Sequence, residues 1–145
     1  MSVQLEGEGV ELDYKGNVEF WSARWAEDKI GFHKDEINPQ LIQHMDKLTN
    51  GEKCRKFFVP LCGKSLDLVY LYKEGHSVFG VESCEKAILD LDKENQIGLK
   101  FNKDTSIYHT EDKRLQIYCG ESTSTSLTMC ITYFIMIVQY VFCVN

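Results

Sequence analysis

Two short stretches of the sequence contain residues suited to binding a nucleoside-like ligand. The first is the turn after the apolar run 55–61, where Gly63 lets the backbone approach a ligand closely. The second is Glu82, which lies 19 positions after Gly63 and ends the run 76–82. A carboxylate about 20 residues after such a turn is well placed to accept hydrogen bonds from ribose hydroxyls. This pairing is typical of sites for adenosine-containing cofactors.

The same turn argues against two phosphate-binding sites. A dinucleotide site needs the full G-x-G-x-x-G pattern, but Gly63 is the only glycine in the turn. Gly63, Lys64 and Ser65 match the end of a P-loop, but the glycine needed five residues before Gly63 is Phe58, which excludes a P-loop. S-adenosylmethionine has no phosphate and remains compatible with a turn that contains one glycine.

The surrounding sequence predicts alternating helices and strands, from apolar residues at helical spacing and from short β-branched runs. In chain order these are helices at 17–25 and 37–48, a strand at 55–61, a helix at 65–74, a strand at 76–82, a helix at 85–95 and weaker strands at 106–109 and 114–119. Asn17 is expected to cap the first helix, and Asn50-Gly51 to end the second. The alternation predicts an α/β fold with a parallel sheet, which binds its ligand beyond the carboxyl ends of the strands.

The composition limits the classes of partner and compartment. The chain has 145 residues and a net charge of -6, which argues against nucleic acid as the main partner. Residues 1–13 contain acids but no lysine or arginine, unlike a secretory signal, so a cytoplasmic protein is expected. The six cysteines include no C-x-x-C pair, which favours reduced thiols over a zinc site or a disulfide framework.

The segment Phe57–Glu82, which reads FFVPLCGKSLDLVYLYKEGHSVFGVE, closely resembles the thiopurine S-methyltransferase family. The family pattern reads roughly PLCGKSxDxxxLxxxGHxVxGVE, and the upstream Trp21, Trp25 and Phe32-His33 also fit it. The resemblance extends over about residues 17–120. It implies an α/β fold, a truncated Rossmann-like class I methyltransferase sheet with an N-terminal helical lid. It also implies S-adenosyl-L-methionine as the cofactor.

The resemblance implies roles for five residues of this sequence. Leu61 would lie against the cofactor from the end of the first strand, beside Gly63, and Glu82 would hold the ribose hydroxyls. Trp21 and the segment through Phe32 would close over the cofactor, and Phe32 would also border the acceptor pocket. The implied reaction is methyl transfer to the sulfur of a small aromatic or heterocyclic thiol, by a protein expected to be a monomer. No catalytic base and no metal ligand are assigned.

Simpler structural roles compete with these assignments. Trp25, like Trp21, suits the apolar face of a helix, and Glu82 taken alone suits a solvated strand end. Cys62 has no base placed for it, so packing in the turn is favoured over nucleophilic catalysis. We expect His33 to make local hydrogen bonds and Asp67 to interact with the dipole of its helix.

The composition changes sharply after Glu121, because residues 122–145 contain no charged side chain. Residues 127–144 form an uncharged run just long enough to be a membrane-spanning candidate. Many of them are β-branched, which favours a strand that substitutes for missing sheet or aggregates. The run is therefore interpreted as a membrane anchor, a sheet substitute or an aggregating tail.

These patterns predict three parts: a flexible N-terminus at 1–16, a partial S-adenosylmethionine-binding domain at 17–120 and a divergent hydrophobic tail at 121–145. The family pattern continues with further strands beyond the third, and a sheet without them has an open pocket and an unpaired edge. The sequence therefore predicts a truncated thiopurine-type methyltransferase with weak or absent turnover. The alternative is a non-catalytic fragment that binds the cofactor or is tethered to a membrane.

Overall fold

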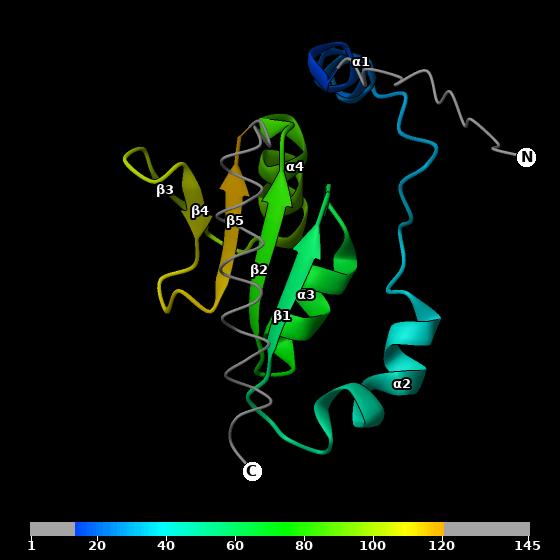
Figure 1. Cartoon of the computed structure of the whole chain (residues 1–145), viewed down its shortest axis with the longest axis vertical. Coiled ribbons are helices and arrows are strands. Elements are labelled where there is room, and N and C mark those ends of the chain that lie inside the picture. The colour runs from blue at the N-terminus through cyan, green and yellow to red at the C-terminus, as the bar shows by residue number, and fades with distance from the viewer. Residues whose placement is uncertain (1–13, 121–145) are drawn as a thin grey trace, which may run out of the picture.

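The computed structural model describes residues 14–120, which contain four helices and five strands (Figure 1). In chain order these are α1 (Tyr14–Ala26), α2 (Pro39–Thr49), β1 (Lys56–Pro60), α3 (Leu66–Lys73), β2 (Ser77–Glu82), α4 (Glu85–Asn95), β3 (Lys100–Asn102), β4 (Ile107–His109) and β5 (Leu115–Cys119). Every helix and strand predicted from the sequence is present, and β3 is an additional one.

The strands form one sheet in the order β1-β2-β5-β4-β3. The first three are parallel to one another, whereas β4 is antiparallel to both β5 and β3. The α/β class is confirmed, and the predicted parallel pairing holds for β1, β2 and β5 but not for β3 and β4. Residues 110–114, which join β4 to β5, are too few for the crossover that a parallel pair requires.

The helix ends follow local capping by side chains and backbone. The Asn38 side chain accepts a hydrogen bond from the N–H of Gln40 at 2.9 Å and so caps α2. Asn50 ends that helix in the left-handed conformation, with φ 53°, as predicted. The expected cap at Asn17 is wrong, because α1 already begins at Tyr14.

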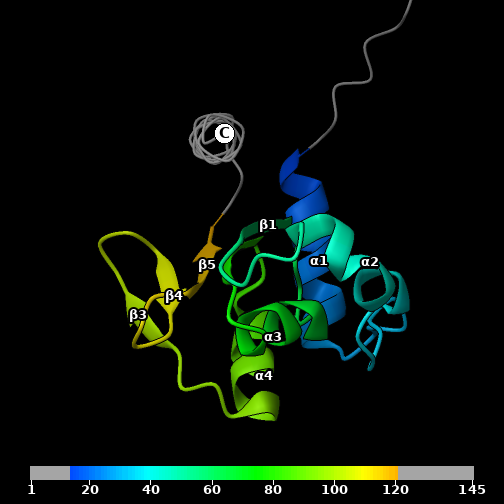
Figure 2. The same ribbon diagram turned by 90° about the horizontal axis from the view of Figure 1, so that it is seen from below.

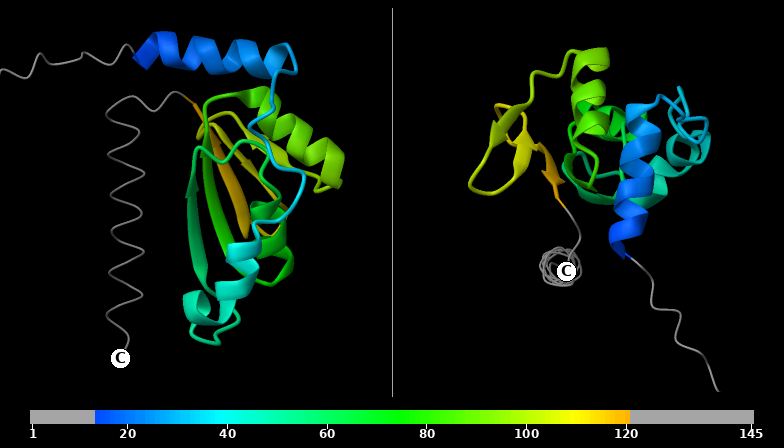
Figure 3. Two further views of the ribbon diagram at one scale, coloured as in Figure 1. Left: turned by 90° about the vertical axis from the view of Figure 1, so that its right-hand side faces the viewer. Right: turned by 90° about the horizontal axis from the view of Figure 1, so that it is seen from above.

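The hydrophobic core lies between the sheet and the two helices α3 and α4, which cover the same face (Figures 1 and 3). Its largest fully buried side chains are Leu68, Ile88, Leu91, Leu115 and Ile117. Helix α1 lies at the carboxyl ends of the parallel strands and packs on α4 through Trp25, Cys84 and Ala87. Figure 2 shows the β3–β4 pair at the edge of the sheet opposite α1 and α2.

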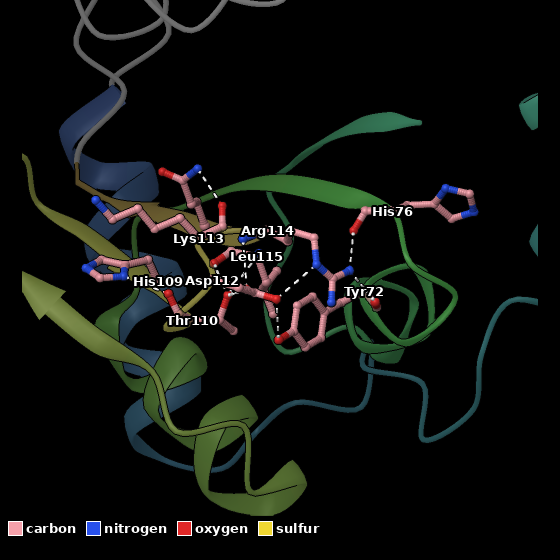
Figure 4. A network of polar contacts seen from close by, with 9 residues as sticks. Tyr72, His76, His109, Thr110, Asp112, Lys113, Arg114 and Leu115 are labelled. Atoms are coloured by element: carbon pink, nitrogen blue, oxygen red, sulfur yellow. Dashed lines mark hydrogen bonds and ion pairs between the residues drawn. The ribbon is translucent and has the colours of Figure 1, made fainter. Parts of the chain in front are cut away.

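A polar network holds the amino ends of β2 and β5 together (Figure 4). Arg114 donates through Nε to Asp112 at 2.9 Å, and through Nη1 to the backbone oxygens of Tyr72 at 3.1 Å and His76 at 3.3 Å. The Thr110 hydroxyl donates to Asp112 at 2.7 Å. The Thr110 hydrogen bond, with further contributions from Arg114, lowers the pKa of Asp112 to about 2. This end of the sheet is therefore fixed by paired groups.

None of the helices between residues 14 and 120 combines the length and apolar character needed to cross a membrane. The membrane-spanning candidate at 127–144 lies outside the described residues, so its three interpretations stay predictions.

Candidate functional site

A cavity of about 430 Å³ lies at the carboxyl end of β1. Residues 27–38, here called the strap, lead from α1 to α2. The strap forms one wall, together with the flanking residues Trp25 and Pro39. The other wall is the β1–α3 turn, residues 61–65, with the first turn of α3. The lining residues are Trp25, Phe32, His33, Lys34, Glu36, Asn38, Pro39, Leu61, Cys62, Gly63, Lys64, Ser65 and Asp67. This is the end of the sheet at which the sequence predicts the ligand site.

The β1–α3 turn has a strained backbone beside the cavity. Leu61 and Gly63 both lie in the left-handed region, with φ 49° and 51°. That conformation costs a residue with a Cβ atom about 1–2 kcal/mol, and Leu61 also leaves 80% of its surface exposed. A strained residue that also exposes a large apolar side chain points to a function at this turn, because such strain gathers at ligand sites.

The turn requires glycine at position 63 for a second reason, because the Trp25 ring lies close to its backbone. A Cβ atom at Gly63 would lie 3.2 Å from Cζ2 of the Trp25 ring. Trp25 is only 4% exposed and closes one end of the cavity. From the sequence, Trp25 is interpreted as part of the apolar face of a helix and is not assigned to the site. Its fit to the family pattern is the signal that could have placed it there.

Glu82 connects the turns that follow β1 and β2. Its Oε2 accepts a hydrogen bond from the N–H of Gly63 at 2.7 Å, and its Oε1 accepts one from the N–H of Cys84 at 2.8 Å. The Ser83 hydroxyl adds a longer contact of 3.4 Å to Oε1. Glu82 is 7% exposed and lies behind Gly63 rather than in the cavity lining.

The aromatic residues of α1 and the strap form one cluster. The Phe32 ring meets Trp21 and Trp25 edge-on, with ring centroids 5.2 and 5.7 Å away. Phe32 lines the cavity, whereas Trp21 lies behind it and is 41% exposed. Of the five residues predicted from the sequence, Phe32, Leu61 and Gly63 line the cavity, and the other two lie against them.

Two other predictions concern side chains in the cavity lining. His33 pairs with Asp35 through Nε2 at 3.1 Å, which is the local interaction expected of it.

The thiol of Cys62 packs so closely on Gly80 that a Cβ atom at Gly80 would lie 2.9 Å from Sγ. Burial, and after it the charge of Glu82, raises the pKa of the Cys62 thiol, which disfavours the nucleophilic thiolate. Both observations agree with a packing role for Cys62.

Asp67 makes a contact that the sequence did not indicate. Its Oδ1 accepts a hydrogen bond from the backbone N–H of Asn38 at 2.8 Å, across 29 positions of the chain. Lys64 also pairs at a distance, with Glu94 of α4 at 2.8 Å. The β1–α3 turn is therefore joined to the strap through one side chain and to α4 through another.

The model of the family described as thiopurine S-methyltransferase matches residues 16–144 of this sequence. The chain belongs to this family. It is 46% identical over 83 residues to the thiopurine S-methyltransferase of Legionella pneumophila strain Corby, which covers 57% of the chain and 37% of that relative. The chain is 48% identical over 80 residues to the Pseudomonas aeruginosa UCBPP-PA14 protein of the same name, and this alignment covers 55% of the chain and 36% of that relative. The chain is 39% identical over 111 residues to the thiopurine S-methyltransferase of Pseudomonas fluorescens Pf0-1, and this alignment covers 75% of the chain and 50% of that relative.

The aligned part of the chain thus spans half or less of the length of these curated relatives. Family membership supports the Rossmann-like class I methyltransferase fold predicted from the sequence, and the observed α/β sheet agrees with it.

Proposed function

We propose that this protein transfers a methyl group from S-adenosyl-L-methionine to the sulfur of a small thiol of the thiopurine type. Membership of the thiopurine S-methyltransferase family supports the reaction. The observation that carries the proposal is the hydrogen bond of 2.7 Å between Gly63, which lines the cavity after β1, and Glu82, which ends β2 behind it. This is the arrangement that an adenosine-containing cofactor uses.

The residues around Gly63 fit such a cofactor. A carboxylate has about four acceptor positions, and Oε2 of Glu82 receives only the Gly63 N–H among the described residues. It therefore retains acceptor capacity for a ribose hydroxyl. The volume of about 430 Å³ lies within the range of about 300–1,000 Å³ that is usual for small-molecule sites. We assign Leu61, Gly63 and Glu82 to the cofactor.

The aromatic cluster fits the other demand of the reaction. Bound S-adenosyl-L-methionine supplies an electrophilic methyl group on a sulfonium, and its transfer to sulfur depends mainly on alignment and exclusion of water. Trp21 and Phe32 can exclude water from the strap side of the cavity, with their rings 5.2 Å apart. Phe32, which reaches the cavity itself, is assigned to the border of the acceptor pocket as well.

Calorimetry with S-adenosylhomocysteine, the demethylated product, tests the proposal on the 145-residue chain. The Glu82→Gln variant should bind about tenfold more weakly, the loss expected when a charged acceptor is replaced. Glu111→Gln is the matched control, because that side chain is 82% exposed and lies at the amino end of β5. A thiopurine methylation assay then separates transfer from binding.

Each outcome of these two measurements has a distinct meaning. Binding that weakens in Glu82→Gln alone, together with methyl transfer, supports the proposal. Binding without transfer favours the alternative of a cofactor-binding protein that is not catalytic. A folded chain that does not bind S-adenosylhomocysteine contradicts both.

A further inference from the structure

The two walls of the cavity are joined by a specific hydrogen bond. Among residues 14–120, the bond from the Asn38 N–H to Oδ1 of Asp67, 2.8 Å long, is the only hydrogen bond or ion pair between the strap and residues 61–67. Trp25, just before the opposite end of the strap, packs on Gly63. The strap is therefore held at one end by an aromatic ring and at the other by a carboxylate.

Both partners of this bond are themselves fixed by local structure. The Asn38 side chain caps α2 by accepting from the N–H of Gln40 at 2.9 Å. Asp67 lies in the first turn of α3, where its own N–H donates to the capping Ser65 hydroxyl at 3.2 Å. The bond thus connects the starts of two helices, and a carboxylate acceptor makes it stronger than a bond between neutral groups.

We propose that Asp67 is a positioning residue that fixes the strap against the β1–α3 turn and so sets the width of the cavity for the cofactor. The inference deepens the proposed function and rests on it for the identity of the ligand. Asp67 acts through Asn38 on the strap, which carries Phe32 and most of the polar residues of that wall. Without the bond, the strap keeps the packing of Ile30 and Phe32 on the Trp25 cluster but has no hydrogen bond to the β1–α3 turn among the described residues.

A matched pair of variants separates this role from a general effect on α3. Asp67→Ala and Asp67→Asn both remove the negative charge that favours the helix dipole, so any loss from the dipole is common to the two. Only Asp67→Asn keeps an oxygen that can accept from Asn38. We expect Asp67→Ala to bind S-adenosylhomocysteine about tenfold more weakly than Asp67→Asn.

The second readout is hydrogen exchange of the Asn38 amide in the ligand-free chain. Its exchange should be about tenfold faster in Asp67→Ala than in Asp67→Asn, with the amides of α4 unchanged. Equal affinity and equal exchange in the two variants would overturn the proposal. If the wild-type chain does not bind S-adenosylhomocysteine, the proposed function fails, and the exchange measurement alone decides whether Asp67 holds the strap.

The donor side of the bond provides a test that leaves Asp67 intact. Asn38→Pro removes the N–H donor, and Asn38 already has φ -58°, which proline adopts. Asn38→Ala loses the same side-chain cap but keeps the donor. Weaker binding in Asn38→Pro than in Asn38→Ala supports the proposal, and equal binding of the two contradicts it.

Discussion

The two ends of the parallel strands differ in whether hydrogen bonds and ion pairs surround a residue with an unfavourable backbone conformation. Each end contains a residue other than glycine in the left-handed region, Lys113 at the amino end with φ 57° and Leu61 at the carboxyl end with φ 49°. Lys113 lies in a tight turn, where its N–H donates to Thr110 at 3.0 Å beside the Arg114–Asp112 pair. Leu61 is 80% exposed beside a cavity.

The amino end of the sheet is built for stability, and the carboxyl end for binding. At the amino end, Arg114 donates to the carbonyl of Tyr72 in α3 and to that of His76, just before β2 (Figure 4). At the carboxyl end, the cost of the strained turn is not offset by contacts of the Leu61 side chain. Substitutions at the first end should therefore change stability alone, whereas those at the second should also change ligand affinity.

The largest expected effect is that of Glu82→Ala. Removing the carboxylate deprives the N–H groups of Gly63 and Cys84 of their acceptor, at about 1–3 kcal/mol each in unfolding free energy. Urea denaturation measures the change. Glu111→Ala is the control and should unfold at almost the wild-type urea concentration. A Glu82→Ala chain as stable as the control would contradict the linking role of Glu82.

Gly63→Ala should have the next largest effect. Gly63 and Gly98 both have positive φ, 51° and 79°, so alanine at either costs about 1–2 kcal/mol. Only at Gly63 does the new Cβ meet Trp25, at 3.2 Å, since nothing lies within 4 Å of it at Gly98. Gly63→Ala should therefore be the less stable variant and alone should shift the tryptophan fluorescence. Identical spectra would mean that Trp25 does not rest on Gly63.

Arg114→Met tests the amino end and should be milder. The substitution removes hydrogen bonds to two carbonyls and to Asp112, for a loss of about 0.5–1.5 kcal/mol in unfolding free energy. The affinity for S-adenosylhomocysteine should stay at the wild-type value. A clear loss of affinity in folded Arg114→Met would break the division between the two ends.

The smallest expected effect is a dependence of stability on pH through His76. Burial lowers the pKa of His76 from its ordinary value of 6.5, and its Nδ1 accepts from the N–H of Arg55 at 3.2 Å. The unfolded chain therefore protonates His76 more readily than the folded chain. The contribution of neutral His76 to the free energy of unfolding is complete above pH 6.5 and is lost as the pH falls through the lowered pKa. Between pH 7 and pH 5, the free energy of unfolding measured by urea denaturation should fall more for the wild type than for His76→Asn. In that variant an amide oxygen, which does not titrate, accepts the hydrogen bond from Arg55. Equal losses would show that His76 does not titrate in this way.

Much of this architecture is predictable from local sequence. The bounds of α4 agree with the prediction, and Gly63 and Glu82 meet as their spacing indicates. Strand β3 was missed because all three of its residues are exposed and show no apolar alternation; it is defined by pairing with β4. The contact of Asp67 with Asn38 joins residues 29 positions apart and has no local signal.

A titration of the ¹⁵N-labelled chain with S-adenosylhomocysteine, followed by NMR, tests most directly whether the ligand binds beside Gly63 and Glu82. Binding at the carboxyl ends of β1 and β2 should change the chemical shifts of the amides of Gly63 and Cys84, which donate to Glu82, and leave those of Arg114 and Leu115 unchanged. Binding that shifts Arg114 and Leu115 while leaving Gly63 and Cys84 unchanged would contradict this prediction, because the ligand would then bind at the opposite end of the sheet.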